Sequence, residues 1–159
     1  MARAAIVGSG SSIPPLQVTN EMLARIMDTS DEWIRERSGV ETRYYVDDGV
    51  ATSDLGVAAS QAALELAGVG KRDVDMVVFA TMTPDHYFPG SGALLQKKLG
   101  LPQVPCFDIR QQCVGFLYGM QLADAHIRSG MARTFNRRRS KYSARPMPTN
   151  ASAITANVQ

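Results

Sequence analysis

The segment 104–130 constrains the fold most, because it joins a short apolar strand pattern to a long apolar helix pattern. Residues 104–109 are expected to form a buried strand, and a helix is expected to begin at or near Cys113. Apolar residues recur on nearly every side of this helix for about three turns, which predicts a helix in the core. Arg128 in the last turn and Gly130 directly after it mark the expected end of the helix.

Cys113 is the residue with reactive potential in this segment. A cysteine at the first turn of a helix lies near the positive end of the helix dipole and near unpaired N–H groups. Both favour the thiolate, which is the form that attacks a carbonyl carbon. Gly115 and Gly119 would leave room beside the sulfur for a narrow acyl chain. The alternative interpretation is that Cys113 is a small core residue without chemistry, as many intracellular cysteines are.

The chain up to residue 134 alternates strand and helix patterns. The run 74–81 is continuously apolar, which is typical of a central parallel strand buried on both faces. The run 4–7 predicts another buried strand, and 40–46 predicts a strand or an extended segment. Helices are expected at about 20–27 with Thr19-Asn20 as the cap, at 31–37 with Ser30 or Thr29 as the cap, and from Thr52 or Ser53 as the cap to about Gly68. The alternation predicts an α/β fold with a mixed, mostly parallel sheet.

The composition is that of a globular domain. The chain has 159 residues, of which 45% are hydrophobic and 20% are charged. The two cysteines, Cys106 and Cys113, give neither a zinc spacing nor a disulfide framework, so a reducing, cytoplasmic compartment is expected. No long apolar run is present, so neither a signal peptide nor a membrane span is expected.

The net charge of +2 is unevenly distributed. All fifteen acidic residues lie at or before Asp124, so residues 1–134 carry a charge of −3 and residues 135–159 carry +5. The basic character belongs to the last segment, and nucleic-acid binding by the domain is not expected. Gly8 and Gly10 follow the first strand, but no third glycine follows them and Pro14 stops a helix from opening there. A dinucleotide site is therefore excluded.

Four motifs resemble those of the β-ketoacyl-acyl-carrier-protein synthase III family, condensing enzymes of the thiolase-like fold. The pattern Phe-Asp-Ile-x-x-x-Cys-x-Gly-Phe-x-Tyr-Gly at 107–119 resembles the active-site elbow of the family. The segment 29–40 resembles the coenzyme A entry segment, and 80–90 resembles a loop that reaches across the dimer interface. The segment 6–14 resembles the first strand and turn of the family. The resemblance runs in order from about Ala4 to about Arg133 and implies a thiolase-like N-terminal half.

The resemblance implies roles for individual residues. Cys113 matches the nucleophile that takes an acyl group from acyl-CoA before condensation with malonyl-acyl carrier protein. Trp33 matches a residue that stacks on the adenine of coenzyme A, Arg37 one that packs against the nucleotide, and Thr29 one near the adenine. From the residues alone, Trp33 could equally fill a groove between helices. Phe88 matches a phenylalanine inserted into the acyl pocket of the partner subunit, which implies a homodimer.

Neither histidine is expected to be catalytic, and no metal or resident cofactor is expected. His86 lies in a loop, and His126 lies near the end of the Cys113 helix, too far along it to reach the sulfur. The second step of the family reaction needs a histidine and an asparagine from the second half of the enzyme, and no histidine follows His126.

Residues 135–159 are rich in arginine and broken by proline, a composition that cannot bury a face. We expect a domain at 1–134 followed by a basic tail that is disordered or frame-shifted, with a natural basic tail as the alternative. Two functions remain open. The chain could belong to an acyltransferase that initiates fatty-acid synthesis. Alternatively, it could be a non-catalytic truncated product, or the docking half of a hetero-oligomeric condensing enzyme of quinolone, polyketide or hydrocarbon type.

Gln111, Gln112 and Val114 stand where small residues are common in the family. The length of the primer acyl chain therefore stays open.

Overall fold

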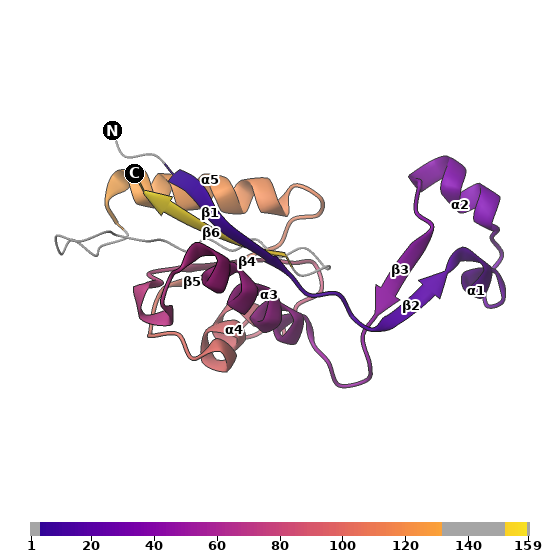
Figure 1. Cartoon of the computed structure of the whole chain (residues 1–159), viewed down its shortest axis with the longest axis horizontal. Coiled ribbons are helices and arrows are strands. Elements are labelled where there is room, and N and C mark those ends of the chain that lie inside the picture. The colour runs from indigo at the N-terminus through magenta and orange to yellow at the C-terminus, as the bar shows by residue number, and fades with distance from the viewer. Residues whose placement is uncertain (1–3, 132–151, 159) are drawn as a thin grey trace. The chain divides into compact units, whose positions relative to one another are not determined.

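The structure, a computed structural model, describes residues 4–131 and the backbone of 152–158 (Figure 1). The chain divides into two compact units, which are described separately. The large unit comprises Met1–Ser12 and Ala51–Gln159, and the small unit comprises Ile13–Val50.

The large unit contains most of the secondary structure. Its elements are β1 (Ala4–Ser11), α3 (Thr52–Ala67), the 3-10 turn η1 (Lys71–Asp73), β4 (Val77–Ala80), α4 (Ser91–Leu99), β5 (Cys106–Ile109), α5 (Gly115–Ser129) and β6 (Ser152–Val158). β4 and β5 are parallel, with Val77 opposite Cys106 and Ala80 opposite Ile109. β1 pairs antiparallel with β6 from Ala4 opposite Val158 to Ser11 opposite Ser152.

β4 is the centre of the large unit, because all four of its residues are buried. On one face, Val77 and Phe79 pack against Ala59 and Ala63 of α3 and Leu95 of α4. On the other face, Val78 packs with Ala123 of α5. Figure 1 shows α5 on one side of the β4–β5 pair and α3 with α4 on the other. Each large apolar side chain buried here contributes roughly 1.5–3 kcal/mol. The predicted α/β class and the predicted buried parallel strand are confirmed.

Gly8 and Gly10, which the sequence placed after the first strand, lie within β1 and allow it to pack closely on α3. A Cβ added to Gly8 would overlap the carbonyl oxygen of Ala63, and one added to Gly10 would overlap the carbonyl oxygen of Ala59. The strand therefore approaches α3 more closely than any other residue type would allow.

The start of α3 differs from the prediction. The N-cap is Ala51, whose N–H donates to a carboxylate oxygen of Asp54 at 2.9 Å. The hydroxyl of Thr52 instead donates to the carbonyl oxygen of Thr83 at 2.6 Å, and the hydroxyl of Ser53 donates to Asp85. Both predicted caps are thus used for contacts with another loop.

Helix α5 is less buried than the sequence predicted. α5 begins at Gly115, two residues after Cys113, and ends as predicted at Gly130, a left-handed cap with φ of 69°. Only one stripe is buried, formed by Gly115, Gly119, Ala123 and Ile127. Leu117 is 61% exposed and Tyr118 is 47% exposed, so the prediction of a helix buried on nearly all sides was wrong for these residues.

The end of the chain is described only in part. Residues 152–158 form β6, where the sequence analysis expected no strand. The other residues of the predicted basic tail, 135–151 and 159, lie outside the described residues.

The small unit consists of an antiparallel pair of strands and the two helices that connect them. Its elements are β2 (Leu16–Thr19), α1 (Asn20–Ala24), α2 (Asp31–Ser38) and β3 (Thr42–Tyr45). β2 pairs with β3 from Leu16 opposite Tyr45 to Thr19 opposite Thr42. The caps are among those predicted, because Thr19 accepts from the N–H of Met22 and Ser30 accepts from that of Trp33.

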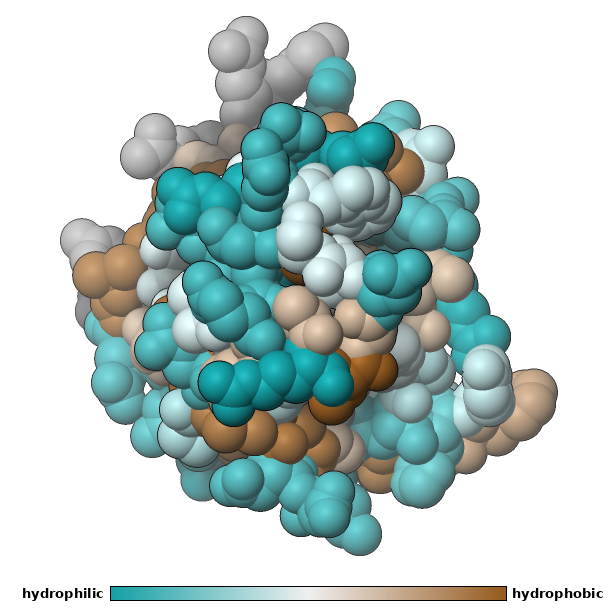
Figure 2. Space-filling view, turned by 90° about the vertical axis from the view of Figure 1, so that its right-hand side faces the viewer, coloured by the Kyte–Doolittle hydropathy of each residue, from teal (hydrophilic) through white to brown (hydrophobic). Residues whose placement is uncertain are grey.

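Very little of the small unit is buried. Pro14, Val18 and Asn20 are its buried residues. Several large apolar side chains are exposed, among them Ile13, Ile26, Met27 and Trp33. Figure 2 shows hydrophobic and hydrophilic residues interleaved on the face that it presents. The small unit therefore has almost no apolar core of its own.

Candidate active site

Cys113 lies in the turn between β5 and α5, and its side chain is exposed. The turn closes where the N–H of Gly115 donates to the carbonyl oxygen of Gln112 at 3.0 Å. Val114 is the N-cap of α5 and has no side-chain hydrogen bond to offer. The sulfur is therefore placed beside a helix start whose N–H groups lack a side-chain cap.

A cavity of about 370 Å³ opens next to Cys113. Its walls come from the end of β4 and from the turn before α5: Ala80, Thr81, Met82, Gln111, Gln112, Cys113, Gly115 and Phe116. Met82 and Phe116 supply apolar surface, and the two glutamines supply hydrogen-bonding groups. A thiol in the wall of a mixed apolar and polar cavity is accessible to a small acyl thioester.

Cys106 has the opposite environment. It is half-buried, and its thiol donates to the carbonyl oxygen of Val104 at 3.5 Å. Burial, followed by the nearby charge of Asp108, raises the pKa of Cys106 from 9.0 to about 11. Cys106 therefore stays protonated at neutral pH and is poorly suited to act as a nucleophile.

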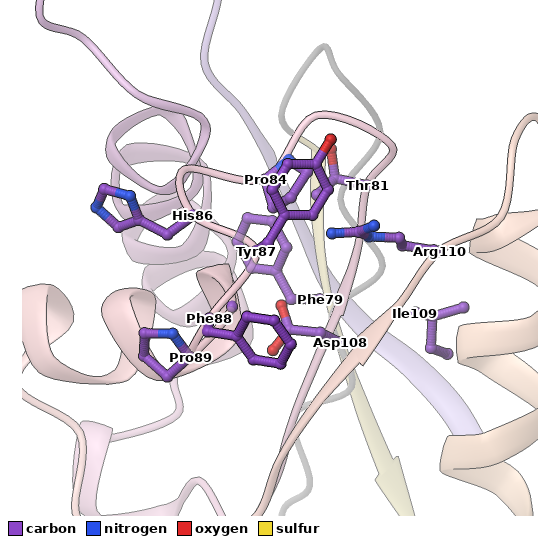
Figure 3. A pocket seen from close by; sticks show the side chains of 11 residues that line it. Phe79, Thr81, Pro84, His86, Tyr87, Phe88, Pro89, Asp108, Ile109 and Arg110 are labelled. Atoms are coloured by element: carbon purple, nitrogen blue, oxygen red, sulfur yellow. The ribbon is translucent and has the colours of Figure 1, made fainter.

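A second cavity, of about 530 Å³, lies beside the loop that carries Phe88 (Figure 3). Phe88 is 92% exposed and Tyr87 is 71% exposed. The guanidinium carbon of Arg110 lies 4.2 Å from the centroid of the Tyr87 ring, and Figure 3 shows the two side chains facing one another. Thr81 lines both cavities. The loop thus presents two exposed aromatic side chains, Phe88 and Tyr87.

Asp85 anchors this loop, and sequence reasoning missed it. Its side chain is only 4% exposed. One carboxylate oxygen accepts from the N–H of Ser53 at 2.9 Å and from the hydroxyl of Ser91 at 2.9 Å. The other accepts from the hydroxyl of Ser53 and lies 3.7 Å from the ammonium of Lys98.

Burial alone would raise the pKa of Asp85, but hydrogen bonds from Ser53 and Ser91 and the charge of Lys98 lower it overall. The carboxylate is therefore held ionised between the start of α3 and the start of α4. The available sequence signal was an acidic residue in the turn-forming sequence Thr-Pro-Asp.

Asp108 contacts the residues at the end of the same loop. Its carboxylate accepts from the N–H of Gly92 in the first turn of α4 at 2.9 Å. Gly90, at the end of the loop, has φ of 98°, and a Cβ there would meet the Asp108 carboxylate. Only glycine fits both constraints.

Trp33 and Arg37 lie together on α2 of the small unit. The guanidinium carbon of Arg37 is 4.5 Å from the centroid of the Trp33 ring, a cation–π arrangement. Trp33 is 52% exposed, so it does not fill a groove within the described small unit. Thr29 lies just before the N-cap Ser30, and its hydroxyl is buried without a hydrogen-bond partner among the described residues. Trp33 and Arg37 thus lie on the exposed surface of α2, and Thr29 precedes the start of this helix.

The two histidines lie away from the Cys113 cavity. His86 is exposed in the Phe88 loop and lines the second cavity. A ring nitrogen of His126 lies 2.9 Å from the carbonyl oxygen of Leu122, and its ring lies 5.3 Å from that of Phe107. These placements agree with the structural interpretation of His126.

No group of three or more metal-ligating side chains occurs among the residues that the structure describes. In the same residues, no helix combines the length and the hydropathy needed to span a membrane.

Comparisons with known proteins point to one family. The profile of 3-oxoacyl-acyl-carrier-protein synthase III matches residues 107–135, the stretch that contains Cys113. Proteins named β-ketoacyl-acyl-carrier-protein synthase III from Rhizorhabdus wittichii and Rhodospirillum rubrum are 45% identical over 132 residues and 48% identical over 135 residues. The alignments cover 83% and 84% of this chain but only 41% and 42% of the relatives.

Solved structures agree with the sequence relatives. The crystal structure of 3-oxoacyl-acyl-carrier-protein synthase III from Aquifex aeolicus matches 97% of this chain and 53% of its own with a TM-score of 0.85 and 28% identity. The priming β-ketosynthase of the R1128 polyketide pathway matches 99% of this chain and 50% of its own with a TM-score of 0.84 and 26% identity. The thiolase-like assignment is thus confirmed by proteins of which this chain spans about half or less.

Proposed function

We propose that this chain, whose resemblance to the β-ketoacyl-acyl-carrier-protein synthase III family the comparisons confirm, carries the acyl-accepting part of a condensing enzyme. The relatives bear the name of an enzyme, which supports the predicted enzyme class. The observation that carries the proposal is the exposed Cys113 thiol, which lines a cavity within the stretch that the family profile matches.

The proposed reaction is the transfer of an acyl group from acyl-CoA to Cys113. The thiolate sulfur attacks the thioester carbonyl carbon, a new carbon–sulfur bond forms, and coenzyme A leaves as a thiolate that then takes up a proton. Negative charge develops on the carbonyl oxygen in between. The uncapped N–H groups at the start of α5 are the donors nearest in sequence to the sulfur that could stabilise it.

Trp33, Arg37 and Thr29 are proposed to bind the coenzyme A portion of the substrate. An exposed indole face can stack on a purine, and a guanidinium can pair with phosphate. In the free structure Arg37 stacks on Trp33, so a purine would have to use the opposite face of the ring or displace the guanidinium.

The remaining partners follow from the family. Acyl carrier protein is proposed as the carrier of the second substrate, malonate. A second copy of the subunit is proposed as the binding partner of Phe88, whose 92% exposure leaves the ring available for an intersubunit contact. The proposed location is the cytoplasm, and no resident cofactor, metal, nucleic acid or membrane is proposed as a partner.

Condensation is proposed to need groups that these 159 residues do not supply. The family mechanism uses a histidine and an asparagine beyond this region, and no histidine follows His126. The chain alone would then be acylated without releasing β-ketoacyl product from malonyl-acyl carrier protein. The polyketide priming synthase is a second candidate for the function of the full enzyme, because its fold matches this chain as closely as that of the fatty-acid enzymes.

Mass spectrometry of the chain incubated with acetyl-CoA tests the acyl transfer. We expect one added acetyl group on the unaltered chain and on Cys106→Ala, and none on Cys113→Ala. Iodoacetamide should also label Cys113 at least about tenfold faster than Cys106, because Cys106 is half-buried and its pKa is about 11. Acetylation of Cys113→Ala at the original rate would exclude Cys113 as the acceptor. Release of β-ketoacyl product by the chain alone would contradict the need for further residues.

A further inference from the structure

Asn20 is the most connected buried polar side chain of the small unit. It is 0% exposed. Its amide nitrogen donates to a carboxylate oxygen of Asp31 at 2.7 Å and to the carbonyl oxygen of Val40 at 2.9 Å. Its amide oxygen accepts from the guanidinium of Arg43 at 2.6 Å. Both N–H groups and the oxygen of the amide are thus used, each by a different segment.

The two donor bonds hold the two ends of α2. Asp31 is the first residue of the helix, and Val40 directly follows its C-cap, Gly39. The acceptor bond joins the same amide to β3 through Arg43, which also donates to the carbonyl oxygen of Val18 on β2 at 3.4 Å. The Asn20 side chain therefore connects both ends of α2 to the β2–β3 strand pair.

Apolar packing contributes little to holding this helix. No residue of α2 is buried. The ion pairs of α2 involve Arg35, whose guanidinium lies 3.9 Å from the carboxylate of Asp31 and 2.7 Å from that of Glu41. All three of these side chains are at least 38% exposed. Exposed ion pairs contribute about 0–1 kcal/mol, whereas hydrogen bonds to charged groups contribute more when they are buried. The Asn20 network is therefore the main directional restraint on α2.

Trp33 and Arg37 lie on α2 between the two points that Asn20 holds. A rotation or shift of the helix would carry both side chains with it, because they sit one helical turn apart on the same face. We propose that Asn20 is a positioning residue for coenzyme A binding. It does not touch the nucleotide, but it orients α2 so that Trp33 and Arg37 present one preformed surface. This inference rests on the proposed coenzyme A function of these two residues.

The chain offers a selective probe, because Trp33 is its only tryptophan. The first measurement is the anisotropy and near-ultraviolet circular dichroism of Trp33 in the free chain, followed by its fluorescence change during titration with coenzyme A. The variants are Asn20→Ala and the exchange Asn20→Asp with Asp31→Asn, which restores a hydrogen bond between the two positions with donor and acceptor reversed. The matched control is Thr19→Ala, which removes the neighbouring cap of α1 without contacting α2.

We expect Asn20→Ala to weaken coenzyme A binding about tenfold or more, since two part-buried bonds to charged groups and one bond to a carbonyl oxygen are lost. Thr19→Ala should stay within about twofold, and the exchange should recover part of the loss. Far-ultraviolet circular dichroism should remain close to that of the unaltered chain. If Asn20→Ala does not fold, Arg43→Gln serves in its place, because it leaves the amide and both its donor bonds intact. It should give a smaller loss in the same direction.

The outcomes separate the two proposals. Unchanged affinity and unchanged Trp33 signals in Asn20→Ala would overturn the positioning role. Failure of the unaltered chain to respond to coenzyme A would overturn the proposed coenzyme A site. In that case the free-chain signals still decide the orientation of α2. If Asn20→Ala lowers the ordering of Trp33 and the exchange restores it, the restraint is supported. If Trp33 is as ordered in Asn20→Ala as in the unaltered chain, the restraint is refuted.

Discussion

Different forces stabilise the interior of the large unit and that of the small unit. In the large unit, β4 is buried on both faces between α3 and α4 on one side and α5 on the other. In the small unit, three residues are buried, and one of them is the amide of Asn20. Apolar burial is non-directional and is shared over many contacts, whereas hydrogen bonds depend on the geometry of particular atoms. Substitutions in the large unit should therefore lower its stability in proportion to the buried volume that they remove. The stability of the small unit should depend on the hydrogen bonds of a few polar atoms.

The two units also use different kinds of buried polar side chain. Asn20 is a neutral amide with partners on α2 and β3, and Asp85 is a carboxylate with partners on α3 and α4. Each one fixes a segment that presents an exposed aromatic residue, Trp33 in the small unit and Phe88 in the large unit. The difference is that Asp85 can titrate and Asn20 cannot.

The largest effect is expected from the centre of the large unit. Phe79→Ala should lower the free energy of unfolding by about 3–5 kcal/mol, because Phe79 is among the largest side chains with 0% exposure. Urea denaturation followed by far-ultraviolet circular dichroism measures the change. Leu117→Ala is the control, and at 61% exposure it should cost less than about 1 kcal/mol. Equal losses for the two variants would show that β4 is not the centre of stability.

A smaller loss is expected at the charged anchor of the Phe88 loop. Asp85→Asn should lower the free energy of unfolding by about 2–3 kcal/mol at neutral pH, because the Lys98 ammonium and the Ser53 and Ser91 donors lose a charged acceptor. Urea denaturation measures this loss, and limited proteolysis of the loop at 84–90 should become faster. A loop that stays equally protected would mean that Asp108 alone is sufficient to hold it.

The same anchor predicts a direction for pH dependence. The pKa of Asp85 is lowered in the folded chain, so its stabilisation is fully present above the ordinary aspartate pKa of 3.8. The stabilisation is lost as the pH falls through the lower folded value. Denaturation midpoints measured from neutral pH down to about pH 3 should fall more steeply for the unaltered chain than for Asp85→Asn. Parallel curves would assign the acid sensitivity to other carboxylates.

The smallest effect is expected on the exposed face of the small unit. Arg35→Gln should change stability by less than about 1 kcal/mol, although it removes the contacts to Asp31 and Glu41, because these side chains are at least 38% exposed. Trp33 fluorescence during urea denaturation reports this unit. A shift as large as that of Asn20→Ala would show that the surface ion pairs, and not the buried amide, hold α2.

Several elements could be predicted because their signals are local. The apolar run at 74–81 gave the buried strand β4, and Ser30, Thr19, Gly68 and Gly130 were correctly expected at helix ends. Capping depends on atoms within a few residues of one another, so the pattern is visible in the chain itself. The motif around Cys113 was likewise local, and the comparisons confirmed the resemblance that it carried.

The errors concern contacts between distant residues. Ser53 was expected to cap α3, but its hydroxyl and N–H bind Asp85, 32 residues away. α5 was expected to be buried on nearly all sides, but only its stripe of Gly115, Gly119, Ala123 and Ile127 is buried. Neither could be deduced from periodicity, because periodicity shows how a helix is patterned and not how many neighbours pack against it.

The sequence by itself determined the alternation of strands and helices that leads to β4 and β5, several helix ends and the resemblance that makes Cys113 a candidate nucleophile, but not β2, α4 or β6. Only the tertiary structure decided that Cys113 is exposed while Cys106 is half-buried, and that Asn20 and Asp85 are the buried polar anchors of the two units. The physical reason is how far apart in the sequence the interacting residues lie. Helix and strand formation and capping depend on neighbours along the chain, whereas burial, and the pKa shifts and hydrogen-bond networks that follow from it, depends on segments brought together by folding.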